Sequence, residues 1–196
     1  MISIHTPHET QLLKLQSPWM VKEDVLTPDW SPFLVLPRQE RAKKPRPIQT
    51  LGGLCDRVRT AAFAELQAYH AFNWASDRFL LEAPHGLPDL WLSLAQEELG
   101  HLSSLLSLLE KLGEKPSDHA VSDWLFVSFM KCQSAREFAV FMASAEERGQ
   151  KAGLRFESDF SKSHQEASEL FGKIARDEQR HIDSAYTYFP VLPKPA

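Results

Sequence analysis

Cysteine is scarce in this chain, and the two that are present, Cys55 and Cys132, stand alone without a CxxC pair. Their isolation gives no support to a disulfide framework or to a thiolate metal site. A large excess of charge is also lacking, because the net charge is only −4. The chain therefore has no global basic field of the kind that gathers nucleic acid, although a local basic patch is compatible with this balance.

Long apolar runs are absent as well. The most continuous one lies near residues 124–130, far short of the roughly 20 residues that span a bilayer. The first residues show no charged start followed by an apolar stretch, so we expect no signal peptide and no membrane association. These absences favour a cytoplasmic protein. The length of 196 residues and the hydrophobic content of 43 % suit one globular domain with an appended arm.

Proline is unevenly distributed, since seven prolines lie before residue 48 and few lie in the helical patterns that follow. We interpret residues 1–48 as a proline-rich extended arm that wraps a domain of residues 49–190. Trp19, Trp30 and Phe33 are its expected packing anchors. Within the arm, residues 38–47 carry five basic residues against one glutamate. A solvated basic loop is one interpretation, and weak contact with RNA is the other, through Arg38, Lys43, Lys44 and Arg46.

Beyond Gln49, the apolar spacing predicts four helices, over residues 50–80, 88–112, 134–160 and 163–188. Pro88 suits the first turn of the second helix, and Gly113 suits its end. Short links join the first helix to the second and the third to the fourth, whereas residues 113–133 form a long connection. No alternation typical of strands is present. The prediction is an all-α, ferritin-like four-helix bundle with a long crossover between helices two and three.

Two of the predicted helices carry Glu-x-x-His on an otherwise apolar face. Steps of three or four residues from Glu98 reach His101 and then only apolar residues, and the same steps from Glu178 reach His181. Residues three apart on a helix lie about 5–6 Å from each other at Cβ, close enough to hold one ion. Each of these helices is therefore expected to present one carboxylate and one imidazole to the core.

The other two helices each offer a single glutamate on an apolar face. Glu65 shares its face with alanines and aromatic residues, and Glu146 shares its face with Phe138 and Met142. The adjacent Glu147 falls on a polar face, so we expect Glu146 to point inward and Glu147 outward. Nearly equal spacings, of 33 residues from Glu65 to Glu98 and 32 from Glu146 to Glu178, fit two helical hairpins.

Four ionised carboxylates facing one core would cost several kcal/mol each unless something compensates their charge. Two divalent cations would supply that charge, and the imidazoles would add nitrogen ligands. One glutamate from each of two helices with Glu-x-x-His from each of the other two is the di-iron or di-manganese carboxylate pattern. We therefore predict two iron or manganese ions per chain. The ligands would be Glu65, Glu98, His101, Glu146, Glu178 and His181. The alternative is a metal-free bundle whose polar core residues pair internally.

Further residues are expected around these ligands. Metal-bound histidines usually donate their second N–H to a carboxylate or carbonyl, so we propose Asp177 as the partner of His101 and Glu97 as the partner of His181. Surface ion pairing with Arg180 is the alternative for these acids. Tyr69, one turn beyond Glu65, is either a redox or hydrogen-bonding residue near the metals or an ordinary core residue.

Two glycines also lie within the third predicted helix. Gly149 and Gly153 follow Glu146, and each costs about 1 kcal/mol relative to alanine in a helix. They indicate either close helix contact or a channel beside the metals.

The chain resembles the ferritin-like superfamily at four motifs. These are F-A-E-L-Q-A (63–68), E-E-L-G-H (97–101), E-E-R-G (146–149) and D-E-Q-R-H (177–181). Within the superfamily it is most similar to an uncharacterised bacterial family of unknown function, from about Pro45 to Tyr186. More loosely, it resembles the tRNA hydroxylases that oxidise a prenylated, thiomethylated adenosine. The resemblance implies a di-iron site at the six predicted ligands. Relatives typically read E-E-A-R-H at helix two, and Leu99-Gly100 departs from that pattern.

The expected function is that of a non-haem di-iron or di-manganese oxidoreductase. It would activate dioxygen or peroxide to oxidise a small molecule or a modified nucleoside, as a hydroxylase does. Iron handling, as a ferroxidase or detoxification protein, is the second class, and a metal-free structural bundle is the third. A homodimer is the default expectation, because closed dimers are the commonest oligomers.

Overall fold

The computed structural model describes residues 28–37, 40 and 42–190. These residues form five α-helices and one short 3₁₀ helix, and no strand lies among them. The α-helices are α2 (Leu51–Arg78), α3 (Leu87–Lys111), α4 (Trp124–Phe129), α5 (Ala135–Phe160) and α6 (Gln165–Tyr188), and the 3₁₀ helix is Pro116–Asp118. The all-α prediction is therefore confirmed. The long helices begin and end within two residues of the predicted bounds, and α4 lies inside the stretch expected to be a connection. None of the described helices combines the length and apolar character needed to cross a membrane.

Side-chain caps and glycines fix where the long helices start and stop. The Thr50 hydroxyl accepts a hydrogen bond from the Gly53 N–H at the start of α2, and Ser134 accepts one from the Glu137 N–H at the start of α5. Such caps satisfy N–H groups that have no partner within the helix. Beyond the end of α3, Gly113 takes a positive φ of 82°, a conformation that favours glycine. Gly113 therefore follows the end of this helix, as the sequence predicts.

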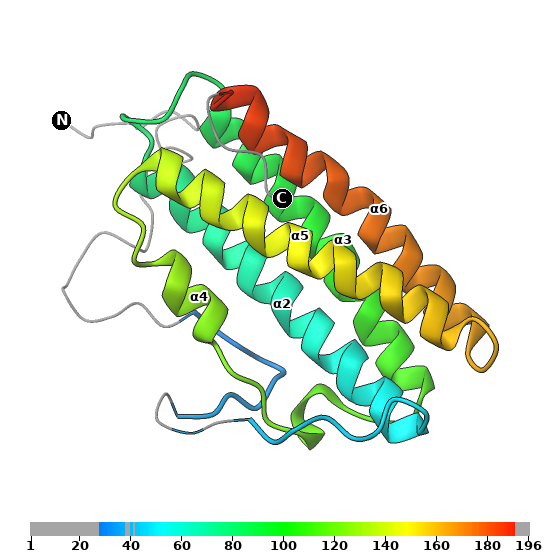
Figure 1. Cartoon of the computed structure of the whole chain (residues 1–196). Coiled ribbons are helices and arrows are strands. Elements are labelled where there is room, and N and C mark those ends of the chain that lie inside the picture. Colours follow the sequence, from blue (N-terminus) through cyan, green and yellow to red (C-terminus); the bar gives the residue numbers. More distant parts are fainter. Residues whose placement is uncertain (1–27, 38–39, 41, 191–196) are drawn as a thin grey trace, which may run out of the picture.

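The four long helices lie alongside one another as two hairpins (Figure 1). α2 packs along α3, and α5 packs along α6, while the hairpins meet mainly through α3 with α6. Between the hairpins, the chain passes back along the length of the bundle through α4 (Figure 1). Because of this crossover, α2 and α5 run in opposite directions (Figure 1). These two helices make little direct contact.

The described part of the N-terminal arm packs on the bundle. Trp30 and Phe33 are both buried in the hydrophobic core, where their rings contact that of Phe63. The predicted anchoring by these two residues is confirmed, whereas Trp19 lies outside the described residues. Farther along, Val35 forms an isolated parallel bridge with Val121 of the crossover. The arm thus contacts both α2 and the crossover, two regions that are distant in sequence.

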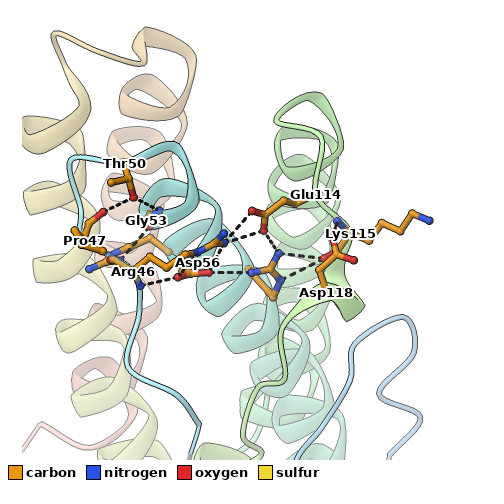
Figure 2. A network of polar contacts seen from close by, with 10 residues as sticks. Arg46, Pro47, Thr50, Gly53, Asp56, Glu114, Lys115 and Asp118 are labelled. Carbon is orange, nitrogen blue, oxygen red and sulfur yellow. Dashed lines mark hydrogen bonds and ion pairs between the residues drawn. The ribbon is translucent and has the colours of Figure 1, made fainter.

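A network of arginines and carboxylates closes one end of the bundle (Figure 2). We call Arg46, Asp56, Arg59 and Glu114 the arginine network. Arg46 Nη2 lies 2.7 Å from Asp56 Oδ1 and 2.9 Å from Glu114 Oε1, and Arg59 pairs with the same two carboxylates. The network ties the arm to the start of α2 and to the turn after α3.

This network bears on the predicted basic strip. Arg46 forms ion pairs with carboxylates of its own chain, so its positive charge is not available to bind a phosphate. Lys43 and Lys44 are exposed, and Arg38 lies outside the described residues. The prediction of a weak RNA contact therefore depends on Lys43 and Lys44 within the described part of the arm.

Candidate metal centre

The six predicted ligands come together in the middle of the bundle. Every one of them projects from a long helix into the core, and all are buried: Glu65, Glu98, His101, Glu146, Glu178 and His181. Glu98 is 0 % exposed and Glu178 is 3 % exposed, values that carboxylates rarely show without a charge partner. The helical period accounts for this convergence, since each residue continues the apolar stripe of its own helix.

Their donor atoms form two overlapping groups. The first comprises Glu65, Glu98, His101 and Glu178, and the second comprises Glu98, Glu146, Glu178 and His181. In each group one donor atom from every residue lies within 4.8 Å of the others, a spacing that can hold a metal ion. Glu98 and Glu178 belong to both groups. The two positions therefore lie side by side, with two carboxylates shared between them.

Both imidazoles turn the same nitrogen toward the carboxylates. His101 Nδ1 lies 3.6 Å from the nearest oxygens of Glu65, Glu98 and Glu178. His181 Nδ1 lies 2.9 Å from Glu98 Oε1 and 2.9 Å from Glu178 Oε2. Neutral imidazole can use such an inward nitrogen as a metal ligand.

The opposite nitrogen of each ring faces an acid on the facing helix. His101 Nε2 of α3 lies 3.4 Å from Asp177 Oδ2 of α6, and His181 Nε2 of α6 lies 3.1 Å from Glu97 Oε2 of α3. The predicted pairs are thus both present, in a reciprocal arrangement. Arg180 also pairs with Glu97, so the two alternatives for that acid occur together. A carboxylate at Nε2 fixes the tautomer and leaves the Nδ1 lone pair directed inward.

The carboxyls of the cluster have shifted pKa values. Burial raises the pKa of Glu65 well above its usual value, and the charge of Glu98 adds to the rise. Burial likewise raises the pKa of Glu146, with repulsion from nearby carboxylates. For Glu98, burial also acts upward, but its close approach to Glu65 and to the two histidines brings its pKa below the usual range. The cluster therefore tolerates only part of the negative charge that four ionised glutamates would carry.

The histidines respond in the opposite sense. Burial alone would lower the pKa of each ring, but Glu65 and Glu98 raise the pKa of His101 to about 10. Glu178 and Glu98 raise the pKa of His181 to about 12 in the same way. The imidazoles and two of the carboxyls thus hold their protons more tightly than the same groups do in water. A bound metal would displace such protons, because metal ligands must be deprotonated.

The polar atoms at the centre show whether a metal fits. Both carboxylate oxygens of Glu98, Oε2 of Glu178, and Nδ1 of His101 and His181 are buried without a hydrogen-bond partner among the described residues. Buried polar atoms without partners are rare in folded proteins and each calls for an explanation. These five atoms belong to four predicted ligands, and all face the shared interior. The oxygen-rich donor set with two imidazoles suits iron or manganese better than structural zinc.

Tyr69 and the pair of Glu146 and Glu147 were also singled out in the sequence. The described contacts of Tyr69 are a ring contact with His70 and a hydrogen bond from the Asn73 amide to the Tyr69 carbonyl. A role for Tyr69 at the metals therefore stays a prediction. Glu146 is buried as expected, whereas Glu147 is only partly buried.

A third group of potential ligands was not predicted from the sequence. Asp56, Glu114 and His119 lie close enough to hold an ion, but Arg46 and Arg59 already compensate the two acids. The i, i+3 spacing of Asp56 and Arg59 is the one sequence signal of this pairing. The group thus resembles a structural network more than a metal site.

Comparison with known proteins gives no assignment, since no family model, curated protein or solved structure matches the chain. The candidate centre is a buried cluster of four glutamates and two histidines that could hold metal, and this conclusion rests on its geometry and donor atoms.

Proposed function

We propose that this protein is a ferritin-like metalloprotein that binds two iron or manganese ions at the six-residue cluster. The observation that carries the proposal is the sharing of Glu98 and Glu178 by two adjacent four-residue groups. One isolated ion would leave donor atoms of the other group buried without a partner. Two divalent ions supply four positive charges, which balance the charges of the four glutamates.

We further propose an oxidoreductase function. Held by these six residues, a pair of redox-active ions would provide a path for electrons from an organic molecule, which is oxidised, to dioxygen or peroxide, which is reduced. The protein itself orients the metal ligands and controls which molecules reach them. Asp177 and Glu97 hold the imidazoles in one orientation, and buried aromatic residues such as Phe72, whose ring stands edge-on to His181, limit access of water from that side.

An opening beside the cluster supports an organic substrate over iron handling. A cavity of about 550 Å³ reaches Glu65, Glu146 and Glu178, and its wall is mostly apolar. Hydrated ferrous ions need a polar path, whereas an apolar wall favours an organic molecule. Oxidation of excess ferrous iron over many turnovers, together with a large assembly, would instead establish the iron-handling function.

The direct test is metal analysis of the purified full chain after anaerobic loading with ferrous or manganous ions. We expect about two ions per chain, and an anomalous-scattering map at both absorption edges would identify them. Glu98→Gln should lose both ions, because both groups share this carboxylate. Glu147→Gln, which removes the same charge from the neighbour of a ligand, should retain both. A wild-type chain that retains no metal would overturn the proposal in favour of a metal-free bundle.

A further inference from the structure

The cavity beside the cluster is a groove between α2 and α5 that continues onto α6 and α4. Its volume of about 550 Å³ lies within the roughly 300–1,000 Å³ typical of small-molecule sites. Alanines and glycines of α2 and α5 form its sides, and Phe129, Phe156 and Phe171 form apolar surfaces within it. At one end the groove reaches three carboxylates of the candidate metal centre. The two helices that form its sides, α2 and α5, make little direct contact with each other.

Arg57 gives the groove a cation away from the metal centre. Its Nη1 donates to the carbonyl of Arg46 at 2.6 Å and to that of Gly53 at 3.1 Å, so the guanidinium is held in place. Among the described residues no carboxylate pairs with Arg57. Arg59, two residues along the same helix, is in contrast 1 % exposed and fully engaged with Asp56 and Glu114. A half-buried, positioned and unpaired guanidinium is suited to bind an anionic group.

The helical geometry sets the separation between this cation and the metal centre. Arg57 precedes Glu65 by eight residues on α2, which corresponds to about 12 Å along the helix axis. On α5, which runs in the opposite direction, Arg155 also lines the groove, and it follows Glu146 by nine residues, or about 13 Å. Both arginines therefore lie toward the same end of the groove. The separation is comparable with the length of an extended medium-chain acyl group.

The two glycines of α5 have different roles. A Cβ added at Gly153 would lie 3.0 Å from Ala175 Cβ and 3.2 Å from the Phe171 carbonyl oxygen, so Gly153 permits close packing of α5 on α6. A Cβ added at Gly149 meets nothing within 4 Å, although Gly149 lines the groove. Close helix contact, one of the two interpretations of these glycines, thus applies to Gly153. At Gly149 the missing side chain leaves the groove open one turn from Glu146.

We propose that this groove binds an elongated, largely apolar molecule with one anionic end, with the anion at Arg57 and the apolar chain extending to Glu65, Glu146 and Glu178. Such a molecule would be the substrate of the proposed oxidoreductase, and in that respect the inference rests on the proposed function. The apolar wall accounts for the chain, and Arg57, which pairs with no carboxylate of the described residues, accounts for the charge. Asp56, which also lines the groove, does not oppose the anion because Arg46 and Arg59 compensate it.

The test measures binding of simple probes to the full chain by isothermal titration calorimetry, first without metal and then after metal loading. Decanoate, decanol and decyltrimethylammonium share one chain and differ in the charge of the head. We expect decanoate to bind with one molecule per chain, decanol about tenfold more weakly and the cation more weakly still. Equal binding of the three probes, or no binding of decanoate, would overturn the proposal.

Two pairs of variants locate the probe. Arg57→Gln should weaken decanoate about tenfold and leave decanol unchanged, whereas Arg78→Gln, which removes the same charge at the other end of α2, should change neither. Gly149→Leu should abolish binding of both probes by filling the groove. Gly100→Leu, at an exposed glycine of α3 with nothing within 4 Å of its added Cβ, is the matched control and should bind normally.

Several outcomes separate this inference from the proposed function. Full decanoate binding in Gly149→Leu, or an equal loss for decanoate and decanol in Arg57→Gln, would contradict the assigned orientation. If the wild type is a dimer and Gly149→Leu is a folded monomer by sedimentation, the groove belongs to a second copy of the chain and the proposal fails. Metal content is measured in every variant. A chain that binds two ions but no decanoate disproves only the groove, and a chain that binds decanoate but no metal disproves only the metal centre.

Discussion

The glutamate–histidine cluster and the arginine network are both built around buried or partly buried carboxylates, yet their charges are compensated differently. In the network, Asp56 and Glu114 each contact two guanidinium groups, Arg46 and Arg59. In the cluster, no lysine or arginine contacts the four glutamates within the described residues, and only two imidazoles lie among them. Within the network, arginines of the chain itself compensate the carboxylates. Within the cluster, five buried ligand atoms have no hydrogen-bond partner among the described residues.

This difference indicates which group is structural and which can bind a ligand. Arginine cannot lose its proton at ordinary pH, so an arginine–carboxylate pair is a permanent contact. Imidazoles and buried carboxyls exchange protons readily, and a cation can replace those protons. The arginine–carboxylate pairs thus connect distant segments of the chain permanently. The imidazoles and carboxyls of the cluster carry protons that a cation can replace, at the place where we propose that metal binds.

The largest expected effect is stabilisation by metal. For each ion present at about a thousandfold excess over its dissociation constant, the free energy of unfolding should rise by about 4 kcal/mol. Urea unfolding of the metal-free chain with and without manganous ions measures the change. Glu98→Gln should lose the response, and Glu147→Gln should keep it. An unchanged midpoint in the wild type would contradict metal binding at the cluster.

Next in size is the loss of a fixed cation from the network. Arg59→Met should lower the free energy of unfolding by about 3–5 kcal/mol, because it leaves Asp56 and Glu114 with only Arg46. Arg176→Met is the matched control, since Arg176 pairs with Glu157 at the surface and should change stability by less than about 1 kcal/mol. Chemical denaturation of both variants in the same metal state provides the comparison. Equal effects would show that the network is not a structural joint.

A smaller effect is expected from the acids behind the histidines. Asp177→Asn and Glu97→Gln should each weaken metal affinity by about 10–100-fold, since the partner carboxylate orients the imidazole and strengthens it as a ligand. Competition with a chromogenic chelator measures the affinity. Glu166→Gln, at an exposed ion pair with Lys111 far from the cluster, should leave it unchanged. If all three variants bind metal equally, the Nε2 contacts have no role in the site.

The sequence was sufficient to predict the four long helices and the inward residues. The period of 3.6 residues determines which side chains share a face of a helix, so the sequence alone assigns Glu146 and Glu147 to different faces. The pairing of Asp177 with His101 and of Glu97 with His181 also followed, because metal-ligating histidines usually donate to a carboxylate. These predictions depended on local spacing and on general chemistry.

Other features depended on contacts between segments that are distant in sequence. Arg59 meets Glu114, which lies 55 residues farther along the chain, and no local pattern indicates that pair. The groove is lined by residues of α2, α4, α5 and α6, which are distant from one another in sequence. The sequence therefore does not indicate that Arg57 lines the groove, whereas Arg59 is buried in the network. α4 was missed because a six-residue apolar run does not distinguish a short helix from a connection.

The smallest effect concerns the response of the network to acid. Burial acts to raise the pKa of Asp56, but hydrogen bonds and charge from Arg46 outweigh it, so that this pKa lies below its usual range. Burial likewise acts to raise the pKa of Glu114, and hydrogen bonds and charges from Arg59 and Arg46 lower it. A carboxyl with a lowered pKa in the folded state stabilises the fold above its unfolded pKa of about 4. That contribution is lost as the pH falls through the folded value.

Asp56→Asn should therefore be less stable than wild type at pH 7, by about 1 kcal/mol for its share of the charged hydrogen bonds. The difference should shrink as the pH approaches 3. Urea unfolding of both metal-free proteins across this range tests the prediction. The cluster titrates equally in both chains, so it cancels from their difference. A gap that stays constant with pH would show that the Asp56 charge contributes nothing to the network, and that its role is confined to hydrogen-bond geometry.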